Sequence, residues 1–433
     1  MTTLVLGLGV TGRAVLRGLA ARGEPAVAVD DRPSPEGVAL AGSLGVALVE
    51  APDAGALARL VDEADAVVPS PGLPDHHPVF ALAEAAGVPI RSEFDLATRW
   101  DQRPLVAITG TNGKTTVTEL TRAMLEASGR RAVAVGNTEV PLVAAIDDPT
   151  IDVFVVEASS FRLLHSEHFA PAVGTWLNLA PDHLDNHASL EAYTAAKARL
   201  WAHQTADQVA IGNADDPVVL RHLREATAHQ ETFGLGSDAD HHVDGPRLVL
   251  ADGAVLADAG ELARSLPHDL ANALAAAATA RAGGASVEGA HDALVAFRGL
   301  PHRVTLVGEA GGVRWYDDSK ATAPHATLAA LAGFESAVLI AGGRNKGLDL
   351  SALAAAAPHV RAVVAIGEAA PEVVAAFDGH RPVHEATSMD DAVATAASLA
   401  RPGDAVLLSP ACASFDWYGS YAERGDDFAR AVD

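Results

Sequence analysis

A glycine-rich loop at residues 110–116, with the sequence GTNGKTT, is the segment whose residue types are best suited to chemistry. An apolar run (105–108) that we expect to be a strand precedes it, and a helical stretch follows it. Backbone N–H groups of such a loop cradle phosphates, the Lys114 ammonium bridges the β- and γ-oxygens, and the Thr115 hydroxyl can ligate Mg²⁺. Ile108 stands where a strict phosphate loop has its first glycine, so an ordinary glycine loop is the alternative. We predict ATP binding here, because strand, loop and helix follow in the required order.

Carboxylate and imidazole side chains follow two further apolar runs. Glu157 opens the segment EASSF (157–161), and His183 lies in the segment DHLDNH (182–187). Ligands of open α/β sheets bind at the carboxyl ends of the strands, so Glu157 and His183 could hold a divalent metal near the γ-phosphate. A hydrogen-bonded loop histidine is the alternative for His183, and it is the favoured interpretation for His187.

Lysine is scarce in this chain. Lys and Arg total 31, and only four of these residues are lysines, at positions 114, 197, 320 and 346. Lys197 falls on the apolar face of an expected helix (190–201), where a charged amine is costly unless it is paired or chemically altered. One interpretation is that the side chain snorkels to the surface. The other is a neutral amine that reacts with CO₂ to give a carbamate, an anionic metal-site group that arginine could not form.

A second glycine-rich turn, GLGVTG at residues 7–12, follows the first expected strand, and Asp30 ends the next one. Its glycines permit close backbone approach, and the following helix directs its N-terminus at an anionic group, as in a nucleotide-binding βαβ unit. Three interpretations remain open from this turn alone: a NAD(P) site, a site for another diphosphate, and a purely structural turn.

The last third of the chain carries three more motifs at expected strand ends: DDSKAT (317–322), GGRNKG (342–347) and SPACASFD (409–416). The first two contain Lys320 and Lys346, so all four lysines lie in loops or helices that could face one cleft. We interpret Cys412 as a small buried thiol, because no Cys/His nucleophile pattern accompanies it.

Strands and helices must position these motifs. The sequence predicts such elements, because apolar strand-like runs alternate with helical stretches along the chain. A length of 433 residues corresponds to roughly two to four domains. Strands that alternate with helices imply parallel sheets. We therefore predict an α/β protein of three domains in series, at residues 1–92, 93–298 and 299–433.

Composition excludes several classes of function. Lys and Arg total 31 against 56 for Asp and Glu, and the formal net charge of −25 opposes a nucleic-acid or anionic-membrane partner. A hydrophobic content of 49% excludes disordered and collagen-like chains. The chain has one cysteine, no signal-peptide pattern and no apolar stretch near the roughly 18 residues of a membrane span. We expect a cytoplasmic protein without stable membrane insertion.

Taken together, the motifs resemble those of the Mur ligases. GTNGKTT and DHLD are shared by Mur ligases and folylpolyglutamate synthetases, whereas DSKAT followed by SPACAS points to the Mur ligase that adds D-glutamate to UDP-N-acetylmuramoyl-L-alanine (UDP-MurNAc-L-Ala). The resemblance spans residues 4–428. It implies a Rossmann-like N-terminal domain for the UDP moiety, a central P-loop ATPase-type domain with a mainly parallel sheet, and a Rossmann-like C-terminal domain for the amino acid.

The resemblance also implies roles for individual residues. The acceptor would contact Val10, Thr11, Asp31, Arg32, Ser70, Gly72, Asn137 and Ser159. ATP would contact Gly110, Thr111, Asn112, Gly113, Lys114, Thr115, Thr116, Asn272, Arg303 and Asp318. Two Mg²⁺ ions would be held by Thr115, Glu157, His183 and a carbamylated Lys197. D-Glutamate would be recognised by Thr322, Lys346, Ser414 and Tyr421, with Lys320 near its carboxylate or the transferred phosphoryl group. The catalytic residues would be Lys114, His183, Lys197 and Lys320.

Three residues depart from the family pattern. Asp269 stands where Asn is usual, Ala323 replaces the usual Asn after DSKAT, and Tyr421 stands where Phe is common. The third change adds a hydroxyl group to the expected amino-acid pocket, so the contacts at Tyr421 are less secure than those at Ser414.

The implied reaction is amide ligation through an acyl phosphate, by a monomeric enzyme. A carboxylate is a poor electrophile, so the L-alanine carboxylate is first phosphorylated by ATP, and the amine of D-glutamate then displaces phosphate. The alternatives are a sister ligase for L-glutamate or another amino acid, and a folylpolyglutamate synthetase. From other classes, an NAD(P)-dependent oxidoreductase would rest on the 7–12 turn, and a P-loop regulatory protein would leave Lys197 unexplained.

Overall fold

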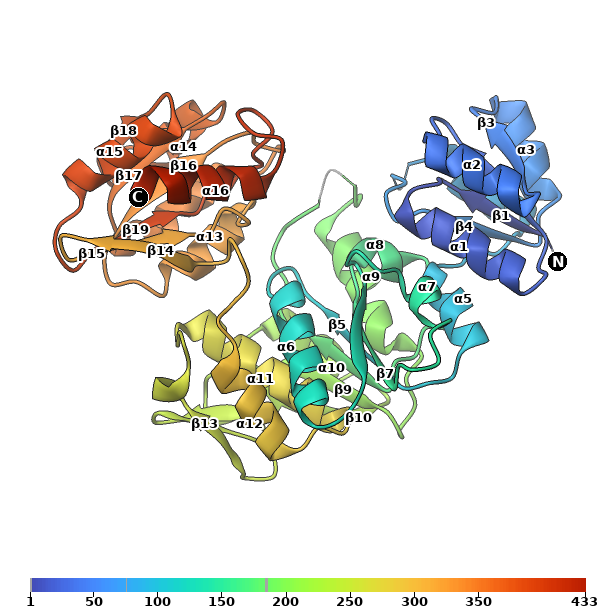
Figure 1. Ribbon diagram of the computed structural model, residues 1–433, viewed down its shortest axis with the longest axis horizontal. Helices are drawn as coiled ribbons and strands as arrows, with labels where there is room; N and C mark the ends of the chain where they lie inside the picture. Colours follow the sequence, from blue (N-terminus) through green and yellow to red (C-terminus); the bar gives the residue numbers. More distant parts are fainter. Residues whose placement is uncertain (1, 75, 184–185) are drawn as a thin grey trace. The chain divides into compact units, whose positions relative to one another are not determined.

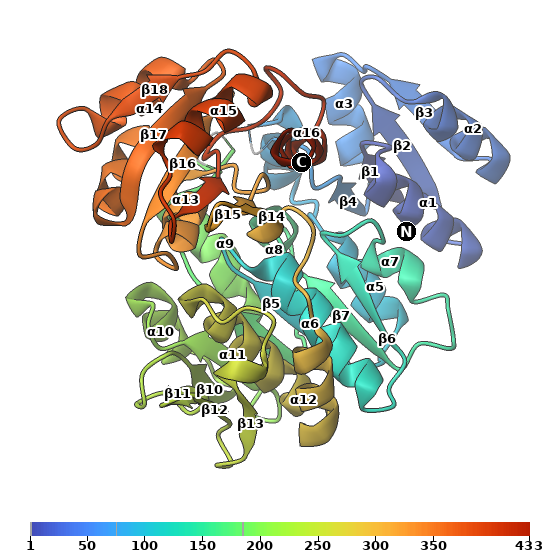
Figure 2. The same ribbon diagram turned by 60° about the vertical axis from the view of Figure 1, so that its left-hand side comes forward.

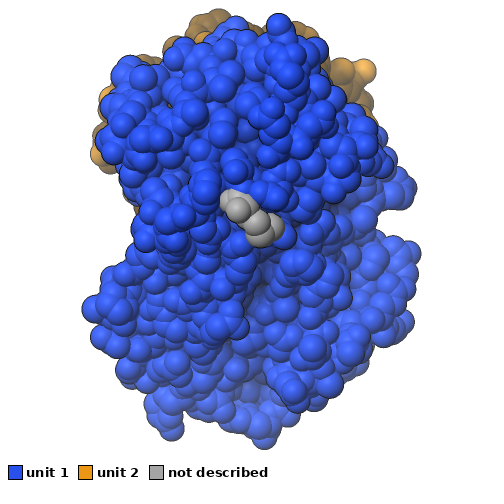
Figure 3. Space-filling view, turned by 90° about the vertical axis from the view of Figure 1, so that its right-hand side faces the viewer, with its two compact units in different colours: residues 1–179, 186–262, 271–296 blue, residues 180–185, 263–270, 297–433 orange. Residues whose placement is uncertain are grey.

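The computed structural model describes residues 2–74, 76–183 and 186–433, which belong to two compact units (Figure 3). Unit 1 comprises residues 1–179, 186–262 and 271–296. Unit 2 comprises residues 180–185, 263–270 and 297–433.

Unit 1 begins with a four-stranded parallel sheet in the order β3-β2-β1-β4, drawn in blue in Figure 1. Leu4 and Leu6 of β1 belong to one apolar cluster and Val5 to another, so both faces of the strand are covered, as parallel sheets require. The elements of this part are β1 (Thr3–Leu6), α1 (Val10–Ala21), β2 (Ala26–Asp30), α2 (Pro35–Leu44), β3 (Ala47–Glu50), α3 (Ala54–Asp62), β4 (Ala66–Pro69), α4 (Pro78–Ala86) and α5 (Glu93–Trp100).

The larger sheet of unit 1 has six parallel strands in the order β10-β9-β8-β5-β7-β6. Its central strand β5 (Leu105–Thr109) pairs Ile108 with Glu157 on one side and Thr109 with Trp176 on the other. The loop after β5 therefore lies between the carboxyl ends of two neighbouring strands. The remaining elements that build this sheet and its flanking helices are α6 (Lys114–Ala127), β6 (Ala132–Gly136), α7 (Leu142–Ala145), β7 (Val153–Glu157), α8 (Ser160–Leu164), β8 (Val173–Trp176), α9 (Leu190–Ala202), β9 (Val209–Asn213), α10 (Pro217–Leu223) and β10 (His229–Phe233).

A small antiparallel sheet, β11-β12-β13, extends from the end of β10. Two helices follow it, and the second packs beside α6 (Figure 2). The elements are β11 (His242–Asp244), β12 (Arg247–Val249), β13 (Val255–Asp258), a 3-10 turn (Ala259–Glu261), α11 (Pro267–Ala282) and α12 (Val287–Ala296).

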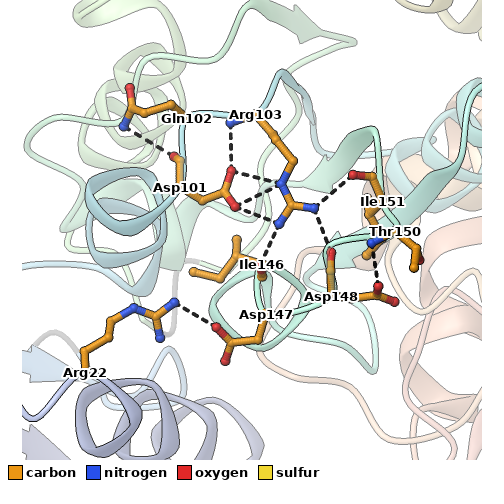
Figure 4. A network of polar contacts seen from close by, with 9 residues as sticks. All are labelled: Arg22, Asp101, Gln102, Arg103, Ile146, Asp147, Asp148, Thr150 and Ile151. Carbon is orange, nitrogen blue, oxygen red and sulfur yellow. Dashed lines mark hydrogen bonds and ion pairs between the residues drawn. The ribbon is translucent and has the colours of Figure 1, made fainter.

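A network of half-buried and exposed polar groups holds the segment that leads from α5 into β5 (Figure 4). Arg103 forms an ion pair with Asp101 at 2.7 Å, and it donates hydrogen bonds to the carbonyl oxygens of Asp148 (2.7 Å) and Ile151 (2.9 Å). One arginine thus fastens the entry of the central strand to the loop before β7.

Unit 2 is built on a six-stranded sheet in the order β14-β15-β19-β16-β17-β18. All pairs are parallel except β14 with β15, which form an antiparallel hairpin at one edge. The elements are β14 (Thr305–Ala310), β15 (Val313–Asp317), α13 (Pro324–Leu331), β16 (Ala337–Gly342), a 3-10 segment (Leu350–His359), β17 (Val360–Ile366), α14 (Ala370–Phe377), β18 (Val383–Glu385), α15 (Met389–Leu399), β19 (Ala405–Leu408) and α16 (Tyr421–Val432).

The predicted α/β class with mainly parallel sheets is confirmed, and so is the helix expected at 190–201, which is α9. The antiparallel sheet β11-β12-β13 and the β14-β15 hairpin were not predicted. Their strands have three to six residues and lie inside an otherwise regular strand and helix alternation, so their own periodicity is too short to mark them. Within the described residues, no helix is both long and apolar enough to cross a membrane.

Candidate functional site

The loop between β5 and α6 has a backbone that only glycine adopts easily. Gly113 has φ +83°, and a Cβ atom on it would lie 2.6 Å from Oδ1 of Asn272. Gly110 has φ +156°, and a Cβ atom there would lie 2.9 Å from the side chain of Leu177. The glycines therefore bring the loop backbone against the neighbouring strand end and against Asn272, which was expected to contact ATP.

The Lys114 ammonium folds back over this loop. Its Nζ donates to the carbonyl oxygens of Gly110 at 2.8 Å and Thr111 at 2.9 Å. Lys114 is the first residue of α6, so its charge lies beside the backbone N–H groups of the first helical turn. Thr115 and Thr116 follow in the same first turn. Backbone N–H groups and an ammonium here suit a polyphosphate.

Asn178 fixes the loop from the adjacent strand end, and sequence reasoning missed it. Its Oδ1 accepts from the backbone N–H groups of Asn112 (2.8 Å) and Thr111 (3.1 Å), and its Nδ2 donates to the Asn112 carbonyl at 3.2 Å. A side-chain amide two residues after β8 was the available signal, because polar residues at parallel strand ends meet the neighbouring loops.

Lys197 is buried, with 1% of its surface exposed, so its amine does not snorkel to the solvent. Its Nζ donates to the carbonyl oxygen of Gly110 at 2.8 Å and lies 4.5 Å from the ring centre of Tyr193. The Tyr193 hydroxyl lies 3.2 Å from Oγ1 of Thr111. Helix α9 thus places an amine directly under the glycine loop.

Glu157 ends β7 with its side chain buried at 2% exposure. Its Oε1 accepts from Nδ2 of Asn137 at 2.8 Å, whereas Oε2 has no hydrogen-bond partner within the described residues. A buried carboxylate oxygen without a protein partner fits a cation, because burying an uncompensated charge is costly. Asn137, expected to contact the acceptor, and Glu157 are therefore direct neighbours.

No group of three or more His, Cys, Asp or Glu side chains that could hold a metal occurs in the described part of the chain. A Mg²⁺ ion at a nucleotide needs only one or two carboxylates, since phosphates and water supply the other ligands. Glu157 fits that requirement. His183 belongs to unit 2, where it lies 3.7 Å from Asp182, so its expected metal role remains a prediction. His187 bonds Ser160 at 2.9 Å, and the motif residues Leu184 and Asp185 lie outside the described residues.

The turn at residues 7–12 is held by close backbone packing within it and by contacts with Asp30 and Ser70. The Leu8 N–H donates to Oδ2 of Asp30 at 2.5 Å, and a Cβ atom on Gly12 would lie 1.8 Å from the Gly7 carbonyl oxygen. Ser70 lies against Gly7, since a Cβ atom on Gly7 would be 2.8 Å from that of Ser70. Among the other residues expected to bind the acceptor, Thr11 is buried, whereas Val10, Asp31, Arg32 and Gly72 are exposed.

A second set of expected residues lies in unit 2. The Lys320 Nζ is 4.9 Å from the ring centre of Tyr421. Asp318 is buried and accepts from the Ser409 hydroxyl at 2.7 Å, and burial raises the pKa of Asp318 to about 7. Arg344 and Ala413 exchange two backbone hydrogen bonds, which join the loop of Lys346 to the loop of Ser414.

Arg424 is a further residue that sequence reasoning missed. Its buried guanidinium donates to Ser319 Oγ at 2.9 Å, to the Ser319 carbonyl at 2.8 Å and to the Cys412 carbonyl at 3.1 Å. Helix α16 therefore braces the segments that carry Lys320, Thr322 and Ser414. Burial raises the pKa of the Cys412 thiol to about 12, which agrees with its interpretation as an inert buried thiol.

Among the three departures from the family pattern, Asp269 has an ion-pair partner. Asp269 forms a two-point ion pair with Arg264 at 2.6 Å, and Arg264 also donates to the Arg303 carbonyl at 3.0 Å. The carboxylate therefore orients an arginine beside the segment that leads into β14.

Models of three protein-family domains match the chain in order. They are a Mur ligase MurD-like N-terminal domain (1–92), a Mur ligase middle domain (108–280) and a Mur ligase glutamate ligase domain (302–412).

Curated relatives match over nearly their full length. The UDP-N-acetylmuramoylalanine–D-glutamate ligases of Frankia casuarinae and Desulfosudis oleivorans are 44% and 40% identical, over 100% and 99% of this chain and 94% and 95% of theirs. That of Nitrosococcus oceani is 38% identical over 100% of this chain and 96% of its own.

Solved structures share the fold at low identity. A pseudomurein peptide ligase type C from Methanothermus fervidus matches with a TM-score of 0.62 and 18% identity, over 94% of this chain and 96% of that one. MurF from Acinetobacter baumannii matches with a TM-score of 0.61 and 18% identity, over 99% and 90%.

Proposed function

The chain belongs to the Mur ligase family, and from that premise we propose that it joins D-glutamate to UDP-MurNAc-L-Ala, with ATP converted to ADP and phosphate. The product is a precursor of peptidoglycan. The names of the curated relatives carry the choice of substrates, and the glycine loop with Lys114 and Lys197 carries the assignment to ATP chemistry. The oxidoreductase alternative loses its basis, because the 7–12 turn lies in a MurD-like N-terminal domain. The regulatory-protein alternative is disfavoured, because the curated relatives are ligases over nearly their full length.

The reaction needs two transfers. The acceptor carboxylate oxygen takes the γ-phosphoryl group of ATP, the bond to the β-phosphate oxygen breaks, and ADP leaves. The amine of D-glutamate then attacks the acyl carbon of the mixed anhydride, inorganic phosphate leaves, and the nitrogen loses a proton to give the amide. The site must hold two anions together, which requires fixed positive charge and oriented N–H groups.

This chain's residues supply those groups. Lys114 can exchange its two carbonyl contacts for phosphate oxygens, while Asn178 keeps the backbone N–H groups of Thr111 and Asn112 in place. Lys320, with Thr322, Lys346, Ser414 and Tyr421, serves the amino acid and the transferred phosphoryl group. Two Mg²⁺ ions, when bound, offset the charge of the phosphates and the acceptor carboxylate. Thr115, Glu157, His183 and Lys197 are the residues that would hold them.

Lys197 acts as a carbamate in this proposal. The neutral amine adds to CO₂ and releases one proton, so an uncharged group becomes an anion under the glycine loop. Burial supports this, because a charged amine with 1% of its surface exposed is costly, and a carbamate that binds a metal ion would avoid that cost.

We also propose that the enzyme works as a monomer in the cytoplasm. All of the residues assigned to the three substrates come from one chain, and its single cysteine is buried and unbridged, as in reducing compartments.

The test is phosphate release from ATP in the presence of UDP-MurNAc-L-Ala, with D-glutamate, L-glutamate or neither, and mass spectrometry of the product. We expect release that depends on D-glutamate and a product that has gained one glutamyl residue. Release that is indifferent to D-glutamate, or supported equally by L-glutamate, would return the substrate to a sister ligase.

A further inference from the structure

A buried arginine links the turn at residues 7–12, here called the acceptor turn, to the central sheet of unit 1. Arg162 lies in α8, with 7% of its side chain exposed, and forms an ion pair with Glu93, which is 2% exposed. The other amino group, Nη2, donates to Oγ1 of Thr11 at 3.1 Å. Glu93 in turn accepts from the Val143 N–H at 3.0 Å. The Arg162 guanidinium therefore joins α5 to the start of α1, and the Glu93 carboxylate extends the link to α7.

The two ends of this link both belong to expected ligand segments. Thr11 lies between Gly9 and Gly12 in the 7–12 turn, which is expected to hold the uridine diphosphate. Arg162 comes five residues after Glu157, and its N–H donates to the Ser159 hydroxyl that caps α8, at 3.4 Å. A shift of Arg162 would therefore move the acceptor turn relative to the strand end that carries Glu157.

A gain in folding stability does not by itself account for the buried ion pair between Arg162 and Glu93. Removing two charges from water costs about as much as their attraction returns, so buried ion pairs contribute to geometry more reliably than to stability. Burial raises the pKa of Glu93, and Arg162 offsets part of that rise. Arg162 Nε is also buried without a hydrogen-bond partner in the described ranges, so the guanidinium is not placed to maximise its own bonds.

Other contacts already hold these parts of unit 1 together. Arg22 pairs with Asp147 at 2.7 Å, as Figure 4 shows, and stacks on Trp100 at 4.3 Å. The Trp100 indole N–H donates to Glu24 at 2.8 Å. Arg22 follows the last residue of α1, about 16 Å along the helix from Thr11. The Arg22 contacts thus hold the C-terminal end of α1. Arg162 contacts its N-terminal end, beside the 7–12 turn.

We propose that Arg162 is a positioning residue for the acceptor: through Thr11 it fixes the 7–12 turn relative to the Glu157 strand end and so sets the affinity for the uridine diphosphate group. This rests on the proposed function, which places the acceptor at that turn. Arg162 does not react, so its loss acts on acceptor binding and leaves ATP binding in place.

The principal variant is Arg162→Lys, which keeps a cation beside Glu93 but has one nitrogen and cannot also reach Thr11. The matched control is Arg22→Gln, which removes an arginine contact from the opposite end of α1. Calorimetry with UDP alone measures affinity without turnover, and KM for UDP-MurNAc-L-Ala, KM for ATP and kcat are measured on the full chain.

We expect Arg162→Lys to raise the Kd for UDP and the KM for the acceptor about 10-fold, with KM for ATP and kcat within about twofold of wild type. Arg22→Gln is expected to leave the Kd for UDP unchanged, whatever it does to Tm. In a Thr11→Val background, Arg162→Lys should have no further effect on UDP, because its partner is gone.

The proposal is overturned if folded Arg162→Lys binds UDP as wild type does, if Arg22→Gln weakens UDP equally, or if the Thr11 and Arg162 effects simply add. If Arg162→Lys does not fold, the neutral pair Glu93→Gln with Arg162→Gln replaces it and is judged by the same Kd. If the wild-type protein binds UDP but releases no phosphate in response to D-glutamate, the proposed function is refuted. The positioning role of Arg162 is then judged by the Kd values for UDP alone.

Discussion

Lys114 and Lys197 both donate to the same carbonyl oxygen, that of Gly110, each at 2.8 Å. Two amines within two hydrogen-bond lengths of each other repel if both are protonated, and one of them is buried. A carbamate on Lys197 would turn this repulsion into attraction toward Lys114 and toward cations at Glu157.

Lys197→Ala should therefore lower kcat by at least about 100-fold, because an anion that orients the phosphoryl-transfer site is lost. Short-chain carboxylates should restore part of the activity by entering the space that the side chain vacates. The measurement is D-glutamate-dependent phosphate release with and without added carboxylate.

Lys197→Arg serves as the matched variant, since it fills the same space with a cation that cannot be carbamylated. It should be inactive and insensitive to carboxylates. Rescue of Lys197→Arg, or full activity of Lys197→Ala, would argue against the carbamate.

Asn178→Ala should raise KM for ATP about 10-fold and lower kcat, because the backbone N–H groups of Thr111 and Asn112 lose their shared acceptor and the loop is no longer preorganised. Steady-state kinetics in ATP measures both. Asn213→Ala is the control, since Asn213 donates to the Leu177 carbonyl at 2.8 Å and, among the described residues, makes no hydrogen bond to the glycine loop. Equal effects of the two variants would contradict a specific role for Asn178.

Gly113→Ala should weaken ATP binding at least about 10-fold. Its φ of +83° costs an L-residue about 1–2 kcal/mol, and the added Cβ would lie 2.6 Å from Asn272. Gly129 has the same φ of +83°, yet a Cβ there meets no atom of the described residues within 4 Å. Gly129→Ala should therefore lower Tm by the conformational cost alone and bind ATP normally. Titration with a fluorescent ATP analogue distinguishes the two variants.

The Asp318 carboxyl should make the free protein less stable as the pH rises from about 4 to about 7. Burial raises its pKa from 3.8 to about 7, so in this window the folded state binds a proton that the unfolded state releases, and stability falls with increasing pH. Asp318→Asn mimics the protonated acid and should remove that slope, so that its Tm gain over wild type is larger at pH 8 than at pH 5.

Thermal unfolding without nucleotide at these two pH values checks the expectation. Asp152→Asn is the control: Arg131 holds the pKa of Asp152 at about 2, so this carboxyl is ionised in both states from pH 5 to 8 and adds no slope. A Tm difference for Asp318→Asn that does not change with pH would contradict a buried, protonated carboxyl.

The family and the α/β class followed from the sequence alone, the family from short contiguous motifs and the class from the alternation of strands and helices. A strand, a glycine loop and a helix in order specify a phosphate cradle locally, and the scarcity of lysine singled out position 197 before its surroundings were known.

Only the tertiary structure decided which groups meet. Asn178 reaches the loop at Thr111, Arg162 reaches both Glu93 and Thr11, and Arg424 reaches Ser319 across 105 positions of sequence. These contacts depend on strand order and register, which bring the carboxyl ends of distant strands to one edge. The type of a residue and the hydrophobic periodicity around it do not determine which distant residue its side chain contacts. That contact depends on how the elements pack in the folded chain.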